Sequence, residues 1–361
     1  MQATGFACVN HPLRWVAIAG AAAAIAACGN GDDAPARGGP TDAVQVVENA
    51  EPGWKPGEEW AVADTPALAI GSEQEGYQFS AIAGAVRLAD GRIAVGDGSA
   101  QVRFFGPRGD LLGAFGSHGA GPEELGEIAR LVALPGDSLV VFDAGNHRIS
   151  VLRPDGGLAG TVAPRMVGPG AELAGVLDDG SFVFGMPLPV PPSDGVARDS
   201  VLYLLVSRDG TKADTLGVAP GGQRFQRVTG GRVTRMTVPF GPAPVASARG
   251  DQVVTGATDE YALRQYRPAP RAARVIRRGV SPRPFTDAEY NRFLDALPHM
   301  RAALQEMPRP RHLPLFSSIA VDRAGNLWVQ DRPASGDAHV AWTVFGPDGI
   351  MLGPVSLPAS F

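Results

Sequence analysis

Val86-Arg-Leu-Ala-Asp-Gly91-Arg-Ile-Ala-Val-Gly-Asp97 places two short apolar segments on either side of an Asp-Gly pair. Short apolar runs bounded by turn residues are typical of strands, and Asp-Gly supplies the positive φ that a two-residue turn requires. The stretch therefore predicts a β-hairpin. Related stretches with a central glycine follow at residues 132–143, 176–184, 248–255 and 319–331.

A second hairpin pattern follows the first. It begins at Phe105, and matching stretches begin at Leu152, Val206 and Phe345. Two successive hairpins make a four-stranded antiparallel sheet. The first three of these residues are 47 and 54 positions apart, and four-stranded repeats of about 40–50 residues are typical of propeller blades. Because one such sheet cannot bury both apolar faces alone, several must pack together.

Two segments resemble known repeat proteins. Asp143-Ala-Gly-Asn146-His147-Arg148-Ile149-Ser-Val-Leu152 resembles the NHL repeat, named for Asn-His-Leu, with Arg148 in place of the leucine. Gly116-Ser-His-Gly-Ala-Gly-Pro-Glu-Glu-Leu125 resembles the Gly-Pro-Gly-Glu-Phe segment of bacterial six-bladed β-propellers. This resemblance covers about residues 44–361 and implies an all-β, six-bladed propeller domain of four-stranded antiparallel blades.

The sixth blade has no clear repeat of its own. Five repeats are evident, so we expect residues 44–70 to contribute strands of a sixth blade. The chain ends at Phe361, soon after a blade's third or fourth strand. The resemblance therefore implies either an unusual ring closure or a shortened C-terminus.

A helical pattern interrupts the strands near residues 286–307. Thr286-Asp-Ala-Glu289 is a capping box, and Phe285 and Tyr290 suit a hydrophobic staple. Apolar residues continue at helical spacing to Leu297, and Pro298 is expected to end or kink the helix. We expect the apolar stripe to cap the propeller core, and the alternative is a lid over a central channel.

The first 43 residues are typical of an export signal and a tether. An apolar run from Trp15 to Ala27 is shorter than the roughly 20 residues that span a bilayer. It ends in Ile25-Ala-Ala-Cys28, which resembles a bacterial lipobox. This predicts a lipoprotein signal peptide over residues 1–27, lipid attachment at Cys28 and a flexible tether over 28–43. The alternative is ordinary secretion with an incidental cysteine.

Lipoprotein sorting adds an expectation about location. Gly29, rather than aspartate, follows the cysteine. By resemblance to lipoproteins of Gram-negative cells, this favours the outer membrane, with the domain facing the periplasm or the cell surface. The lipid anchor is the only membrane contact that we expect.

Several chemistries have no support in the sequence. The formal charge is −5 and no basic stripe stands out, which argues against nucleic-acid binding. Both cysteines, Cys8 and Cys28, precede the domain, so it can hold no disulfide or thiolate metal site. No GxSxG, HExxH or Walker A motif occurs, and the six histidines lack metal-ligand spacing. The sequence therefore predicts no catalytic site.

Two sets of polar residues remain as candidates. His118, Glu123 and Glu124 lie in a connection between blades, and a blade-to-blade loop holds three more candidate ligand-binding residues, Asn146, His147 and Arg148. The alternative for both is a structural turn. Carboxylates end equivalent strands in three repeats, at Asp97, Asp143 and Asp331. They could hold a divalent cation such as calcium, and no other cofactor is expected. The alternative for these is turn capping.

Together these observations predict an exported, lipid-anchored propeller that binds a peptide, glycan or partner protein. Two alternatives stay open. One is a metal-dependent enzyme similar to gluconolactonase-like and lyase propellers, with the three aspartates as its first candidate ligands. The other is a scaffold without a small ligand, which an apolar surface patch would mark.

Overall fold

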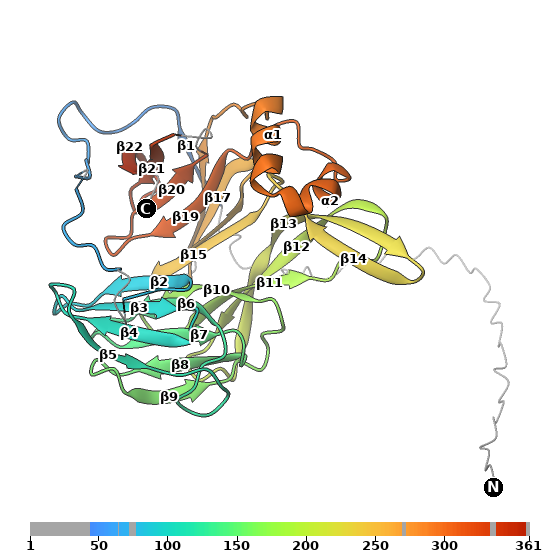
Figure 1. Cartoon of the computed structure of the whole chain (residues 1–361). Coiled ribbons are helices and arrows are strands. Elements are labelled where there is room, and N and C mark those ends of the chain that lie inside the picture. The colour runs from blue at the N-terminus through green and yellow to red at the C-terminus, as the bar shows by residue number, and fades with distance from the viewer. Residues whose placement is uncertain (1–43, 64, 72–76, 269–271, 333–336, 359–361) are drawn as a thin grey trace, which may run out of the picture. The chain divides into compact units, whose positions relative to one another are not determined.

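The computed structural model describes residues 44–63, 65–71, 77–268, 272–332 and 337–358. The predicted signal peptide, Cys28 and the tether up to residue 43 lie outside the described residues. The described part is mostly β, with short helices in one place (Figure 1). No helix in these ranges is long and apolar enough to cross a bilayer.

Five consecutive four-stranded antiparallel units make up the described fold, as the two-hairpin repeat predicts. Unit I contains β2 (Ile82–Arg87), β3 (Ile93–Asp97), β4 (Gln101–Phe105) and β5 (Leu111–Phe115). Unit II contains β6 (Ile128–Ala133), β7 (Leu139–Asp143), β8 (Arg148–Leu152) and β9 (Leu158–Val162). Unit III contains β10 (Glu172–Leu177), β11 (Phe182–Leu188), β12 (Gly195–Val206) and β13 (Ala213–Thr229).

The last two units repeat the arrangement. Unit IV contains β15 (Pro244–Gly250), β16 (Gln252–Ala257), β17 (Glu260–Arg267) and β18 (Ala272–Arg278). Unit V contains β19 (Phe316–Val321), β20 (Leu327–Asp331), β21 (His339–Phe345) and β22 (Met351–Pro358). Two further strands extend these sheets: β14 (Arg232–Thr237) pairs with β13, and β1 (Gln45–Asn49) pairs in parallel with β18.

The Asp-Gly turn of the first hairpin differs from its prediction in length. Gly91 has the expected positive φ of 89°. The Leu88 N–H donates to Arg92 O at 2.8 Å, and the Gly91 N–H donates to Leu88 O at 3.1 Å. Three residues, rather than two, therefore lie between the paired positions, an arrangement that is also common in hairpins.

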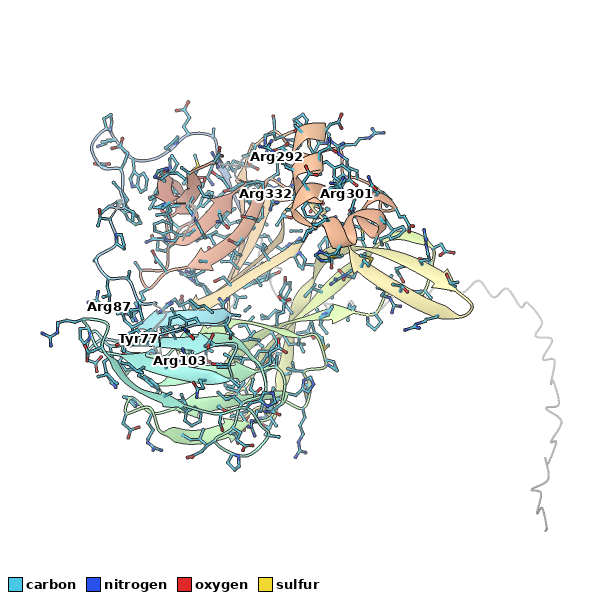
Figure 2. All side chains as sticks on the ribbon, in the orientation of Figure 1. Tyr77, Arg87, Arg103, Arg292, Arg301 and Arg332 are labelled. Carbon is cyan, nitrogen blue, oxygen red and sulfur yellow. The ribbon has the colours of Figure 1, made fainter. Side chains whose placement is uncertain are left out.

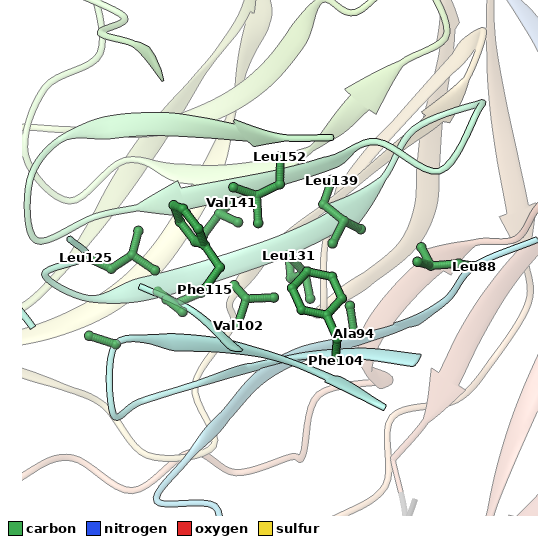
Figure 3. Packing of buried hydrophobic residues seen from close by; sticks show 12 residues of the cluster. Leu88, Ala94, Val102, Phe104, Phe115, Leu125, Leu131, Leu139, Val141 and Leu152 are labelled. Carbon is green, nitrogen blue, oxygen red and sulfur yellow. The ribbon is translucent and has the colours of Figure 1, made fainter. Parts of the chain in front are cut away.

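Apolar clusters join the units face to face in chain order. The cluster between units I and II combines Val102 and Phe104 with Leu131 and Leu139 (Figure 3). Corresponding clusters join unit II to III, III to IV and IV to V. Each fully buried leucine or phenylalanine stabilises such a contact by about 1.5–3 kcal/mol. The units therefore depend on one another, as the repeat pattern implies.

Units III and IV are also joined by main-chain pairing. β10 pairs in parallel with β15, with Gly175 opposite Ala248, and this merges the two units into one ten-stranded sheet. A Cβ atom on Gly175 would lie 1.9 Å from the Ala248 carbonyl oxygen. Only glycine allows the two strands to approach so closely.

Residues from the segment 50–80 cover the outward face of unit V. Leu327 and Val329 belong to the cluster shared with unit IV, so the intervening Trp328 points to the opposite face. There the Trp60 ring packs against Trp328 at 5.7 Å between ring centroids and against Trp54 at 5.4 Å. The Trp54 N–H donates to Leu352 O of β22 at 2.9 Å.

The same segment covers the outward face of unit I. Phe104 faces unit II, so Phe105, which is fully buried, faces the opposite way. Its ring packs against Tyr77 at 5.6 Å and Phe79 at 6.1 Å. Figure 2 labels Tyr77 and Arg103 at unit I, and the Leu111 N–H donates to the Tyr77 hydroxyl at 2.9 Å.

The expectation that residues 44–70 form strands of a sixth blade therefore needs correction. The one strand described in that range, β1, belongs to unit IV's sheet. Aromatic side chains on irregular backbone, instead of strands, cover the end faces of units I and V. A blade count of six stays a prediction, because the described residues form five units.

The predicted capping box is confirmed. Helix α1 (Asp287–Ala296) begins after Thr286, whose Oγ1 accepts from the Glu289 N–H at 3.3 Å. The 3₁₀ turn η1 (Pro298–Met300) and helix α2 (Arg301–Gln305) follow. Their apolar stripe, which includes Leu294 and Leu304, packs with Phe225 of β13 and Met236 of β14. The stripe thus covers the extension of unit III and not a core shared by several units, which corrects the expected position.

Glu289 should give this helix a measurable pH dependence. Its carboxylate accepts from Arg283 Nη1 at 2.7 Å and from the Thr286 N–H at 3.1 Å, and these bonds lower the pKa of Glu289 to about 2. A lowered folded-state pKa stabilises the fold above the ordinary pKa of 4.5 and loses that effect as the pH falls toward 2. We expect Glu289→Gln to lower the melting temperature at pH 7 and to match the wild type near pH 2. Thermal unfolding between these pH values checks this. An equal deficit at every pH would contradict it.

Candidate functional site

The six predicted ligand-binding residues meet in one place, at the loop between β5 and β6. Asn146 Nδ2 donates to the Gly119 carbonyl at 2.8 Å. Arg148 Nη2 donates to the Gly121 carbonyl at 2.6 Å, and Glu124 Oε2 accepts from the Gly121 N–H at 2.7 Å. These three side chains therefore hold the loop in shape. The other three lie exposed on its surface: His118, Glu123 and His147. Ligand binding by the six residues stays a prediction.

The aspartates predicted to bind a cation are bound by protein donors instead. Asp143 Oδ1 accepts from the Gly126 and Glu127 N–H groups, each at 3.0 Å, and Oδ2 accepts from Asn146 Nδ2 at 2.7 Å. Asp97 accepts in the same way from the Ser80 N–H at 2.9 Å. Burial raises the pKa of Asp97, but its hydrogen bonds outweigh this and the net pKa is lowered.

The third aspartate has a different environment. Asp331 accepts from Thr343 Oγ1 at 3.0 Å and lies 3.5 Å from Arg278 Nη1. Burial raises the pKa of Asp331, against the opposing effect of Arg278. Among the described residues no three His, Cys, Asp or Glu side chains are grouped to hold a metal ion. The three aspartates do not form a shared site, and cation binding by any of them stays a prediction.

A different group of charged side chains lines a pocket of about 170 Å³. Its walls come from β6 of unit II, from β10 to β13 of unit III and from β15 of unit IV. Two cations, two carboxylates and a phenol contribute to the lining: Arg130, Arg224, Glu172, Asp199 and Tyr203. No sequence motif had indicated these residues.

Arg130 and Glu172 occupy equivalent positions in neighbouring units. Arg130 directly precedes the buried Leu131 in β6, the first strand of unit II. In the same way, Glu172 directly precedes the buried Leu173 in β10, the first strand of unit III. Because successive side chains alternate across a strand, burying the leucine turns the preceding charged side chain away from the apolar cluster. The Arg-Leu and Glu-Leu pairs at one repeat position are the sequence signal that could have identified them.

The guanidinium of Arg130 and the carboxylate of Glu172 have no protein partner among the described residues. Neither makes a hydrogen bond, and no ion pair within 4.0 Å joins them to each other or to another described side chain. Desolvation lowers the pKa of Arg130, and the nearby Glu172 carboxylate opposes this effect. Both residues are exposed, and both line the pocket. An unpaired guanidinium in partly desolvated surroundings is a strong binding group for a carboxylate or phosphate.

Asp199 reaches the pocket wall through a β-bulge. In the pairing of β12 with β13, Arg198 lies opposite Gln223 and Ser200 opposite Pro220, so two glycines face Asp199. Such a bulge redirects the side chain beside it. A Cβ atom on Gly221 would lie 1.9 Å from Asp199 Oδ1. The carboxylate therefore requires glycine at this position.

Asp199 and Arg224 form a pair that leaves one buried oxygen unsatisfied. Arg224 Nε donates to Asp199 Oδ2 at 3.2 Å, while Arg224 Nη1 donates to Thr237 Oγ1 at 2.6 Å. Asp199 is only 7 % exposed, yet no described residue donates a hydrogen bond to its Oδ1. An unsatisfied buried carboxylate oxygen is unfavourable, and natural proteins tend to keep such atoms at functional sites.

Tyr203 lines the pocket as a neutral phenol. Its hydroxyl donates to Val245 O at 3.3 Å. Burial raises the pKa of Tyr203 well above its usual value, and the Glu172 carboxylate adds to this effect. The side chain is therefore a hydrogen-bonding group, and not a general base, at physiological pH.

A second pocket of about 490 Å³ lies at the hairpin turns. Residues from the turns of all five units line it, including Ala89, Pro135, Asp178, Asp251 and Ala324. Several of its charged groups are bound within the protein. Arg267 lies 3.5 Å from Asp251, and the Asp322 carboxylate accepts from two N–H groups and two side chains. The pocket shows that the first turns of the five units meet in one place.

Comparisons with known proteins give structural likenesses only. No protein-family model matches the chain, and no curated protein matches it significantly. A putative exported protein from Bacteroides fragilis NCTC 9343 is similar at 10% identity and a TM-score of 0.46, over 88% of this chain and 81% of that one. A DUF4221 family member from Bacteroides vulgatus ATCC 8482 has 9% identity and a TM-score of 0.45, over 81% and 85% of the two chains.

An enzyme is also among the similar structures. A catalytically inactive virginiamycin B lyase from Staphylococcus aureus, solved with quinupristin, has 9% identity and a TM-score of 0.37, over 76% of this chain and 71% of that one. Because all three TM-scores are below 0.5, the proposals below are drawn from the residues of this chain.

Proposed function

We propose that this chain is an exported, lipid-anchored propeller protein that binds a small polar ligand in the pocket of Arg130, Glu172, Asp199, Tyr203 and Arg224. The five sequential four-stranded units and the meeting of their first turns support a propeller arrangement. The described residues form five of these units, and aromatic side chains such as Trp60 and Tyr77 cover the outward faces of units V and I. Export and anchoring rest on the apolar run and on the lipobox-like segment before Cys28.

The observation that carries the binding proposal is the pair of unpartnered charges. Arg130 and Glu172 line one small pocket without a hydrogen bond or ion pair to any described residue. Side chains that serve only stability usually pair with opposite charges or extend into bulk solvent. Charges that are kept apart in a recess are instead available to a ligand.

A thermal-shift screen of small organic acids, amines, amino acids and sugars against the purified full chain tests this proposal. A ligand that binds only the folded state raises the melting temperature in proportion to its concentration and affinity. We expect at least one binder, and we expect Arg130→Gln to weaken it by about 10–100-fold, the effect of losing one charged hydrogen bond. Arg108→Gln is the matched control, because Arg108 lies exposed in the β4–β5 turn.

Two results would contradict the proposal. One is that no compound raises the melting temperature of the wild type. The other is that every binder protects the Arg130→Gln/Glu172→Gln double variant as well as it protects the wild type. The second result would place the binding surface elsewhere on the protein.

A further inference from the structure

The charges in the pocket divide into one internal pair and two groups available to a ligand. Asp199 and Arg224 neutralise each other through the 3.2 Å contact between Arg224 Nε and Asp199 Oδ2. Arg130 and Glu172 then remain, more than 4.0 Å apart and without described partners. Together they present one positive and one negative group on the same recess.

This arrangement discriminates against ligands of a single charge. A simple anion bound at Arg130 would lie within the field of Glu172, whose carboxylate acts electrostatically on both Arg130 and Tyr203. A simple cation bound at Glu172 would likewise be repelled by Arg130. A like charge placed close to the bound ligand disfavours binding as effectively as an opposite charge favours it. A ligand that carries both charges satisfies both groups at once.

The size and the remaining walls of the pocket restrict the ligand further. Its volume of about 170 Å³ is below the roughly 300–1,000 Å³ of sites for drug-sized molecules. Apolar side chains complete the lining next to the charged groups: Leu173, Ala174, Pro187, Val201, Pro244 and Ala246. A small molecule with an ammonium, a carboxylate and a short aliphatic portion matches these walls.

We propose that the ligand is a zwitterionic α-amino acid with an aliphatic side chain. The carboxylate binds the Arg130 guanidinium, the ammonium donates to the Glu172 carboxylate, and the side chain contacts Pro187 and Val201. This inference rests on the proposed function and specifies the ligand class of the same site.

Matched ligands test the two charged contacts separately. Alanine, valine and leucine are titrated into the full chain by calorimetry, together with 4-methylpentanoate and 3-methylbutylamine, which are leucine without its amine and without its carboxylate. At least one amino acid should bind. If leucine is that amino acid, each half-ligand should bind about 10–100-fold more weakly, the effect of one lost charged hydrogen bond. If alanine or valine binds best, its own deaminated and decarboxylated analogues replace the half-ligands.

Two variants assign each contact to its residue. Arg130→Gln should weaken amino-acid binding about 10–100-fold and should strengthen binding of the amine, because the variant removes the positive charge that repels it. Glu172→Gln should weaken amino-acid binding similarly and should strengthen binding of the carboxylate, because the variant removes the negative charge that repels it. Circular dichroism of each variant confirms that the fold is intact. Conservative replacement of these accessible side chains is compatible with folding, because neither has a described partner.

Each outcome decides between the two proposals. If none of the three amino acids binds, or if a half-ligand binds as tightly as its parent, the zwitterion inference is overturned. If the wider screen still finds a ligand that depends on Arg130, the proposed binding function stands without it. If neither the screen nor the titrations detects a ligand at this pocket, both proposals fail.

Discussion

Gly175→Ala should destabilise the protein by at least about 3 kcal/mol, because the added methyl group has no space between units III and IV. The new Cβ atom would lie 1.9 Å from the Ala248 carbonyl oxygen, which belongs to the parallel pairing of β10 with β15. The clash involves backbone on both sides, so a side-chain rotation cannot relieve it, and overpacking of this severity reaches or exceeds about 3 kcal/mol. Urea unfolding of the variant and the wild type measures the difference.

Gly160→Ala provides the matched control. Gly160 also lies in a strand, β9, but no atom lies within 4 Å of the position that its Cβ would occupy. We expect this substitution to change the free energy of unfolding by no more than about 0.5 kcal/mol. Equal effects of the two substitutions would show that β10 and β15 do not approach each other as described.

Asp143→Ala should also be strongly destabilising, by about 3–5 kcal/mol. Asp143 is completely buried and accepts hydrogen bonds from the Gly126, Glu127 and Asn146 N–H groups. Its carboxylate also lies 3.5 Å from Arg148 Nε. Its removal leaves these N–H donors without their acceptor and the Arg148 guanidinium without its ion-pair partner.

An exposed turn carboxylate serves as the comparison. Asp155 accepts one hydrogen bond, from the Gly157 N–H at 2.9 Å, and its side chain is 70 % exposed. We expect Asp155→Ala to lower the free energy of unfolding far less than Asp143→Ala does. Similar losses in the two variants would contradict a structural role for Asp143. A fall in the wild-type melting temperature on addition of a chelator would instead favour the predicted cation.

Local sequence signals predicted much of the fold. Each hairpin combines apolar segments with a turn glycine inside about a dozen residues, so its pattern is readable without tertiary information. The capping box of Thr286 and Glu289 spans four residues for the same reason. Long-range pairing was not readable. β1 lies more than 220 residues before its partner β18, and nothing in its sequence distinguishes that strand from others.

The packing of Tyr77 on the outward face of unit I and of Trp60 on that of unit V could not be predicted, for a related reason. Tyr77 and Trp60 belong to segments without strand or helix periodicity. Where they pack depends only on the sheet faces that carry Phe105 and Trp328. The repeat pattern alone predicts strands over residues 44–70, because a sixth blade would need them. Exposed aromatic faces on two end sheets required a cover, but they did not require strands.

The candidate site was harder to predict than the fold. His118, Asn146 and the residues beside them stood out because they form short motifs, and the structure uses several of these residues to shape a loop. Arg130 and Glu172 are separated by more than forty residues and meet only because β6 and β10 begin neighbouring units. Aligning the first strands of the repeats would have placed both residues at one position.

A crystal structure of the protein with the strongest binder from the screen tests the central claim most directly. We expect the ligand to lie in the pocket between units II, III and IV, with an anionic group on the Arg130 guanidinium and a donor on the Glu172 carboxylate. A ligand bound anywhere else, with both of these side chains still unpaired, would contradict it.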